Sequence, residues 1–186
     1  NLRGQTRLQL DESLNRVPGL YLQNRYNFAQ GLRLSSRGFG SRAPFGVRGL
    51  RLNVDGFPET LPDGQSQLDS IDLFAVEQLT VLRGPSSLFY GNATGGVVDI
   101  DTRSGKTRGD AASVSMIGGS HGLTQANVQT RGRHGQGHHA LSLTALDYRG
   151  FREQSEVRKY QFTGEAGWDL ADTRSMTLLL TAMAVS

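Results

Sequence analysis

The stretch that decides the fold is residues 75–102, AVEQLTVLRGPSSLFYGNATGGVVDIDT. It begins with a β-rich run at residues 78–82, which the breaker pair Gly84-Pro85 ends. Residues 86–90 leave room for about one helical turn. A return strand is expected at residues 97–102. Strand, turn, helical turn and strand make a compact unit with little apolar surface, so this unit must pack inside a larger structure.

Four glycines, Gly84, Gly91, Gly95 and Gly96, punctuate that stretch. Glycine adopts positive φ without the steric cost that a Cβ atom imposes, and it also allows two backbones to approach closely. We therefore predict that at least two of the four have a positive φ.

Three motifs carry a family resemblance. The run VEQLTVLRGPSSLFYGNATGGVV at residues 76–98 resembles the signature of the plug domain of TonB-dependent outer-membrane receptors. Upstream, SRGFG at residues 36–40 and NVDGFP at residues 53–58 are similar to two further plug motifs, in the expected order and at the expected distances. The likeness spans residues 10–105. Phe89 and Asp99 depart from the residues most common in the family, and neither alters the turns.

Composition agrees with a turn-rich β protein. The 186 residues include 24 glycines and 37% hydrophobic residues. No run approaches the ~18 apolar residues of a transmembrane helix, although barrel strands alternate and escape such a search. The absence of cysteine excludes disulfides and thiolate metal sites. A net charge of +3 is too small to indicate nucleic acid binding.

The first part of the chain predicts an α+β domain, a small mixed sheet with short helices. Helices are expected at residues 10–17 and 69–77. Strands are expected at residues 19–25, 32–37 and 47–54, in addition to the two already named. The polar segment 57–66 is expected to be an exposed loop because it contains Pro58 and Pro62.

After residue 105 the pattern changes to longer alternating runs. Strands of about the length that crosses a bilayer obliquely are expected at residues 111–118, 123–132, 138–148, 158–169 and 175–186. In residues 158–169 one face carries Tyr160, Phe162, Ala166 and Trp168, and the other carries Gln161, Thr163, Glu165 and Asp169. The two aromatic ends resemble barrel girdles. An ordinary half-buried sheet fits this segment equally well, and its place after a plug motif favours antiparallel transmembrane strands of a barrel that this chain leaves incomplete.

No arrangement of residues predicts an enzyme. Serines, histidines and carboxylates do not form a nucleophile–base pattern. His134, His138 and His139 lie in a Gly-rich turn and are better explained as solvated turn residues than as metal ligands. Asp99 and Asp101 share one strand face, which alternation explains without calcium. We therefore expect no catalytic residue, no bound metal and no cofactor.

Binding residues are assigned by the resemblance. In the family, the turn that matches Arg37 faces the extracellular ligand pocket, and Tyr90 and residues 57–67, including Phe57 and Gln65, fall where two further apical loops lie. Tyr90 is equally well explained as a buried plug residue. Arg48 and Arg83 precede glycines at strand edges, and pairing with barrel carboxylates, as a plug–barrel latch, is favoured over ligand contact for both.

The resemblance implies residues 1–105 as plug and residues 106–186 as about the first five strands of a barrel of about 22 strands. It implies an outer-membrane receptor of a Gram-negative bacterium that imports a scarce nutrient, most often a ferric siderophore, with TonB, ExbB and ExbD. A vitamin, a sugar polymer or another metal complex remains open as cargo. A soluble β-rich binding or adhesion module is the competing class, and it predicts solubility without detergent. No basic-then-apolar signal segment stands at Asn1, so a mature or truncated start is expected. The family's TonB-contacting box is not recognisable in residues 1–9, and most of the barrel is missing, so a fragment is expected.

Overall fold

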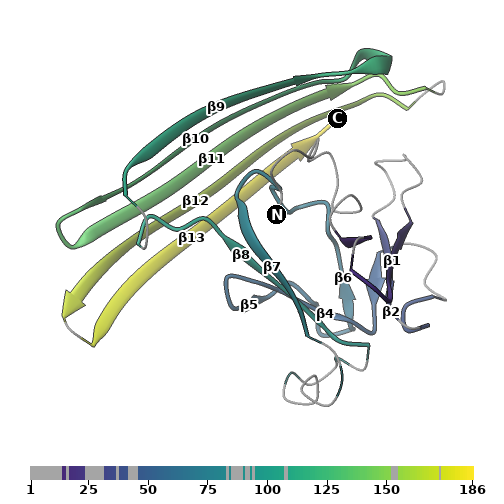
Figure 1. The fold of residues 1–186 in the computed structure, drawn as a ribbon, viewed down its shortest axis with the longest axis horizontal. Coiled ribbons are helices and arrows are strands. Elements are labelled where there is room, and N and C mark those ends of the chain that lie inside the picture. The colour runs from purple at the N-terminus through teal and green to yellow at the C-terminus, as the bar shows by residue number, and fades with distance from the viewer. Residues whose placement is uncertain are drawn as a thin grey trace. The chain divides into compact units, whose positions relative to one another are not determined.

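The computed structural model divides the chain into two compact units, Asn1–Thr102 and Arg103–Ser186. It describes residues 14–15, 17–23, 32–36, 38–41, 46–82, 84, 90, 93, 95–106, 109–151, 155–171 and 173–186. The division falls three residues before the boundary expected from the sequence. Each unit is built around its own sheets (Figure 1).

The first unit contains two four-stranded sheets. One has the order β1-β2-β3-β6, and the other has the order β5-β4-β8-β7. β2 runs parallel to β3 and β4 runs parallel to β8, whereas the other neighbours are antiparallel, so both sheets are mixed. The mixed pairing was expected, but in one small sheet and not in two. The strands are β1 Leu20–Gln23, β2 Arg33–Ser36, β3 Val47–Arg48, β4 Arg51–Val54, β5 Phe57–Pro58, β6 Gln65–Ser66, β7 Val76–Leu82 and β8 Val97–Thr102.

The strand expected at residues 47–54 is wrong as a single element. Gly49 has φ +72°, a left-handed conformation that interrupts an extended strand. The chain therefore leaves one sheet after β3 and enters the other at β4, with Leu50 fully buried between them. The loop expected at residues 57–66 likewise contains the short strands β5 and β6.

The short helix expected at residues 69–77 is also wrong. The segment forms two successive turns, closed by bonds from Ile71 N to Leu68 O and from Ala75 N to Asp72 O. The buried Asp72 carboxylate accepts a hydrogen bond from Phe74 N at 3.0 Å, a local bond that competes with helical pairing. The other two helical segments expected in this unit lie mostly outside the described residues.

A single hydrophobic core joins the two small sheets. Leu22, Leu34 and Val47 enter it from one sheet, and Leu52, Val98 and Ile100 enter it from the other. Leu14, Leu50 and Ile71 come from the connecting segments. The core is small and aliphatic, which suits a domain whose strands are only two to seven residues long.

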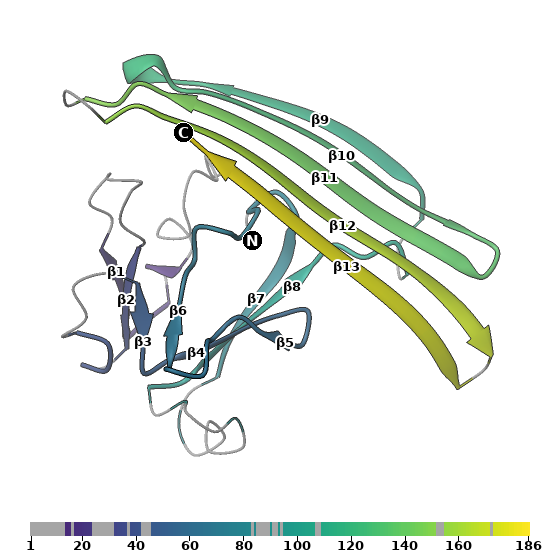
Figure 2. The same cartoon turned by 180° about the vertical axis from the view of Figure 1, so that it is seen from behind.

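The second unit is a five-stranded antiparallel sheet in which every strand pairs with its sequence neighbours, as Figure 2 shows from behind. Its strands are β9 Ala111–Gly118, β10 Thr124–His134, β11 Gly137–Tyr148, β12 Val157–Ala171 and β13 Arg174–Val185. A 3-10 helix, η2 at Ser120–Gly122, joins β9 to β10. All five expected strands are confirmed.

The two faces of this sheet differ in polarity, as the alternation predicts. Tyr160 and Trp168 on β12 are 59% and 43% exposed, whereas Gln161 between them is 8% exposed. We call the two sides the apolar face and the polar face. On the polar face Asn127 Nδ2 donates to Ser142 Oγ at 3.0 Å and to Thr144 Oγ1 at 2.8 Å. The apolar side is therefore the exposed one, the reverse of a sheet in a soluble domain.

Two of the four glycines singled out in the sequence have positive φ, which confirms that prediction. Gly84 has φ +89° and Gly96 has φ +123°. Gly91 lies outside the described residues. Gly95 meets the other requirement, close approach, because a Cβ there would lie 2.8 Å from Gly49 O.

Candidate functional site

The SRGFG motif at residues 36–40 and the Gly95-Gly96 pair of the motif at residues 76–98 meet at residues 49–51. Gly95 N donates to Gly49 O at 2.7 Å, and Arg51 N donates to Gly96 O at 3.0 Å. A Cβ on Gly95 would lie 2.7 Å from the Phe39 Cβ, so the turn that follows Arg37 packs directly on Gly95. Phe39 and Gly95, which belong to different motifs and lie more than fifty residues apart in sequence, are therefore in contact.

The turn carrying Phe39 is held by its glycines. Ser36 and Phe39 bond each other through both backbone groups, at 3.0 and 2.8 Å. Gly40 has φ +77°, and a Cβ there would lie 2.6 Å from Leu34 O and 2.9 Å from Arg48 O. Gly38 has φ +90° and open space around it. The turn therefore rests on β2 and β3 through Gly40, while Gly38 projects freely.

Arg51 fixes the position of Tyr90. Its Nη1 donates to Tyr90 O at 2.6 Å, and its Nε donates to Asn53 Oδ1 at 3.2 Å. Both hydrogen bonds are partly buried, and a hydrogen bond from a charged donor is stronger there than in water. Tyr90 itself is half-buried. The sequence pattern does not single out Arg51, because this residue has the place of an ordinary alternating polar residue in a strand.

Gln65 also lies next to this region. In β6 it pairs with Arg48 of β3, and its amide Nε2 donates to Asp63 Oδ2 at 2.8 Å. Phe57 lies away from this region, because it pairs with Val54 at the opposite end of β4 from Arg51. Its side chain is 64% exposed. The structure thus gathers Phe39, Gln65, Tyr90 and Gly95 around residues 48–51, a region we call the junction, and leaves Phe57 outside it.

Three arginines complete the set of candidates. Arg37 and Arg83 lie outside the described residues. Arg48 is exposed at the end of β3, and no described carboxylate lies within ion-pair distance of it. A latch role for Arg48 and Arg83 stays a prediction.

Carboxylates gather on the strand pair β7–β8. Burial raises the pKa of Asp101 above its ordinary value of 3.8, and the negative charges of Asp99, Asp55 and Glu77 add to the shift. Asp55 is itself engaged, since it accepts hydrogen bonds from Thr102 N and Thr102 Oγ1, each at 2.7 Å. The described residues hold no cluster of three or more residues able to bind a metal ion.

The raised pKa of Asp101 predicts that the stability of the plug depends on pH. Because the pKa of Asp101 is higher in the folded plug than in the unfolded chain, the proton binds the folded state more tightly, and this group favours folding below pH 3.8 and disfavours it above the raised pKa. Asp101→Asn should therefore raise the free energy of unfolding of the plug at about pH 7 and leave it nearly unchanged at about pH 4. Urea titration of the full-length receptor in detergent at both pH values measures this. An equal effect at both would contradict it.

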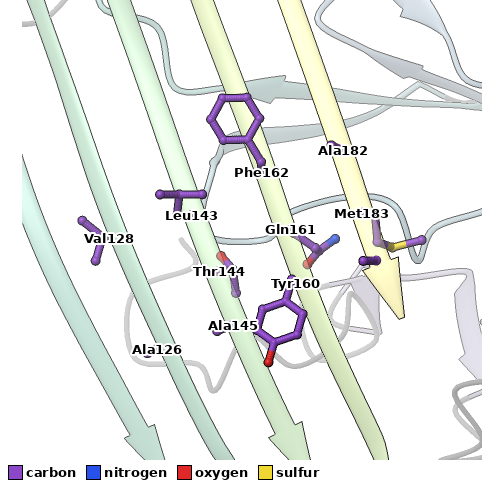
Figure 3. Close-up of a pocket in the computed structure, with 11 residues that line it drawn as sticks. Ala126, Val128, Leu143, Thr144, Ala145, Tyr160, Gln161, Phe162, Ala182 and Met183 are labelled. Atoms are coloured by element: carbon purple, nitrogen blue, oxygen red, sulfur yellow. The ribbon is translucent and has the colours of Figure 1, made fainter. Parts of the chain in front are cut away.

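A cavity of about 450 Å³ opens on the apolar face of the five-stranded sheet. Tyr160 and Phe162 stand on β12 beside Leu143 of β11 and Val128 of β10 (Figure 3). The Phe162 ring also covers Gly164, where a Cβ would lie 2.9 Å from the ring. Without a charged side chain in its lining, the cavity offers nothing to orient a polar ligand. It is part of the apolar face and not a candidate for the ligand site.

No helix in the described part of the chain is long and apolar enough to cross a membrane.

Comparison with protein families decides the classification. The family described as TonB-dependent Receptor Plug Domain matches residues 1–97, which hold the junction, two motifs and all but the last residue of the third motif. The chain belongs to this family. Two curated relatives agree over 90 residues each, the Rhizobactin receptor of Rhizobium meliloti (strain 1021) at 36% identity and the Ferric aerobactin receptor of Klebsiella pneumoniae at 33% identity. These matches cover 43% and 48% of this chain and 11% of each relative.

Solved structures share the fold of this TonB-dependent receptor plug and the strands that follow it. The siderophore receptor PirA from Pseudomonas aeruginosa aligns with a TM-score of 0.68 and 22% identity over 98% of this chain and 33% of its own. The Copper transporter OprC aligns with a TM-score of 0.73 and 16% identity over 95% of this chain and 28% of its own. The predicted fold class, a plug domain followed by antiparallel barrel-type strands, is confirmed, and the family is one of receptors.

Proposed function

We propose that this chain is the plug and the first barrel strands of an outer-membrane receptor of a Gram-negative bacterium that binds and imports a ferric siderophore. The observation that carries the proposal is the junction, where separate plug motifs meet around residues 48–51. Two curated relatives that match at 36% and 33% identity are named for rhizobactin and for ferric aerobactin. Their ligands supply the first probes.

Capture depends on what the junction presents. Tyr90 offers a flat ring that is half-buried and has its backbone fixed by Arg51. Arg37 directly precedes the turn that packs on Gly95, and its guanidinium can donate two parallel hydrogen bonds to a carboxylate of an anionic chelate. Gln65 adds an amide at the same region. A small polar and aromatic platform of this kind suits a ferric chelate that carries carboxylates.

Import also requires the plug to change its conformation. Its strands are two to seven residues long and its core is small, so parts of it can open at low free-energy cost. We propose that TonB, energised by ExbB and ExbD in the inner membrane, pulls on the N-terminal side and rearranges the plug.

The five-stranded sheet supplies part of the barrel wall. Its apolar face, flanked by Tyr160 and Trp168 on β12, suits the lipid of the outer membrane, and its polar face suits a lumen. The loops alternate accordingly, since β10–β11 is closed by a two-residue turn while β11 and β12 are separated by residues 149–156. The remaining strands of a barrel of about 22 would come from the rest of the receptor.

A binding titration tests the ligand assignment. In the full-length receptor, Arg37→Ala combined with Tyr90→Ala should weaken the binding of ferric aerobactin at least tenfold, a loss of about 1.4 kcal/mol, because both the charged and the aromatic contact are removed. The matched control is Phe57→Ala, which changes an exposed aromatic residue outside the junction and should alter Kd less than about twofold.

The titration is read at fixed salt, with ferric rhizobactin as a second probe and cobalamin as a vitamin cargo. Equal Kd values for wild type and the double variant would overturn the assignment of Arg37 and Tyr90. Tight binding of cobalamin without binding of either ferric siderophore would keep the fold and replace the cargo. A receptor that remains soluble and monodisperse without detergent would favour the adhesion module instead.

A further inference from the structure

The segment just before the first barrel strand is bound to the polar face of the sheet by three side chains. Arg103 Nη1 donates to Gln129 Oε1 on β10. Ser104 Oγ donates to Glu165 Oε1 on β12 at 2.8 Å. Lys106 Nζ lies 3.4 Å from Asp169 Oδ1, also on β12. We call residues 103–106 the anchor segment.

The backbone of this segment lies directly against the sheet. Gly105 is buried, and a Cβ there would lie 2.7 Å from Gly132 O and closer still to His139 O. Both are backbone atoms of β10 and β11, so they cannot move aside as the end of a flexible side chain can. Only glycine allows this approach.

Glu165 depends on the anchor segment for its hydrogen bonding. The Glu165 side chain is 11% exposed, and His138 Nε2 lies 3.2 Å from its Oε1. The His138 side chain lies in β11 and is only 1% exposed, so the expectation that His138 is a solvated turn residue is wrong. The His138 ring is fixed in turn, because it occupies the space that a Cβ on Gly167 would take. His138 Nε2 does not donate a hydrogen bond to Glu165 despite this short distance. Since a buried carboxylate needs donors, the Ser104 hydroxyl is a required partner.

A second carboxylate holds the far end of the segment. Asp169 accepts from Arg133 Nη2 at 2.6 Å, and Arg133 Nη1 also donates to Lys106 O at 3.1 Å. Arg133 therefore bonds both the Lys106 backbone and the Asp169 carboxylate, and the Lys106 ammonium faces the same carboxylate. Contacts from β10, β11 and β12 therefore hold residues 103–106 in place. These residues are not part of a strand, since β9 begins at Ala111.

From these contacts we propose that residues 103–106 are a fixed anchor, which keeps its place on the barrel wall while the plug residues before it rearrange during import. The proposal rests on the proposed function, since it assigns the point at which plug movement stops. The division of the chain into compact units falls at the same place, between Thr102 and Arg103. The anchor is separate from the Arg48 and Arg83 latch expected from the sequence.

Backbone exchange tests whether the anchor exists as described. In the full-length receptor in detergent, Gly105→Ala should speed hydrogen–deuterium exchange of residues 103–106 at least tenfold, because its Cβ cannot fit against Gly132 and His139. Gly109→Ala is the matched control, since a Cβ at Gly109 meets nothing within 4 Å. Unchanged exchange in Gly105→Ala, in a receptor that folds, would overturn the proposal.

Cross-linking tests whether the anchor stays fixed during transport. Cysteines at Ser104 and Glu165 are joined by a short cleavable thiol cross-linker in one receptor, and cysteines at Asp55 and Thr102 in another, since Asp55 bonds Thr102 within the plug. Uptake of iron-labelled aerobactin by cells is measured before and after cleavage of the linker. We expect the first cross-link to change uptake less than about twofold and the second to lower it at least tenfold, with ligand binding intact.

The outcomes separate the two proposals. A Ser104–Glu165 cross-link that lowers uptake tenfold, reversed by cleavage, means that the segment must move and overturns the anchor. If neither cross-link lowers uptake, the plug residues just before the segment do not have to move during import. The segment is then not the point at which plug movement stops, and the anchor is overturned as well. Wild-type receptor that imports no ferric aerobactin and no ferric rhizobactin contradicts the proposed function, while the exchange experiment on Gly105→Ala still decides whether the anchor segment is held.

Discussion

Leu180→Arg should weaken insertion of the receptor by about 2–4 kcal/mol. Leu180 lies on the apolar face of β13, 57% exposed, opposite Gly164, which is midway between Tyr160 and Trp168 on β12. If that face meets lipid, this row lies near the bilayer midplane, where an arginine costs about 2–4 kcal/mol. The measurement is the free energy of folding of the full-length receptor into lipid vesicles.

The matched control is the next residue along the same strand. Thr181 is also exposed, but alternation places it on the polar face, opposite Thr163. Thr181→Arg should change the folding free energy by less than about 1 kcal/mol, because its charge enters a lumen and not lipid. Equal losses for the two variants would mean that both faces meet the same solvent, and the barrel assignment would be wrong.

Gly40→Ala should disorder the junction while the barrel still inserts. The left-handed backbone at φ +77° costs a residue with a Cβ about 1–2 kcal/mol, and the Cβ would in addition lie 2.6 Å from Leu34 O. Because Leu34 and Arg48 are sheet residues, relief requires the turn to lift off β2 and β3. We expect at least a tenfold loss in affinity for ferric aerobactin, measured by titration.

Gly38 provides the control, since its φ is +90° and a Cβ there meets nothing within 4 Å. Gly38→Ala carries the backbone cost without the collision, so its effect on affinity should be clearly smaller than that of Gly40→Ala. If the two variants bind alike, contact of this turn with the sheet has no part in forming the site.

The sequence predicts most of the fold, because the decisive signals are local. Alternation along residues 158–169 identifies both faces of β12, and the turn residues between strands place all five strands of the larger sheet. The failures occur where distant residues decide. Gly49 reads as part of a strand, yet it is where the chain passes from one sheet to the other, and the Asp72 carboxylate bonds its own backbone where a helix was expected.

The candidate site could be predicted only in part, for the same reason. Motif resemblance indicates Gln65 and Tyr90, and both lie by residues 48–51. It also indicates Phe57, which the register of β4 and β5 places at the opposite end of β4. Arg51 and Gly105 carry no signal in a single sequence, because the bond to Tyr90 O and the approach to β10 and β11 arise only when the chain is folded.

Uptake of radioactive iron by living cells tests the central claim most directly. Cells that lack their own siderophore receptors and express this receptor at full length are supplied with iron-loaded aerobactin or rhizobactin, in strains with and without TonB. We predict iron accumulation with at least one of the two chelates in the strain with TonB, and at least tenfold less in the strain without it. Equal uptake in the two strains, or none above cells without the receptor for either chelate, would contradict TonB-dependent import of a ferric siderophore.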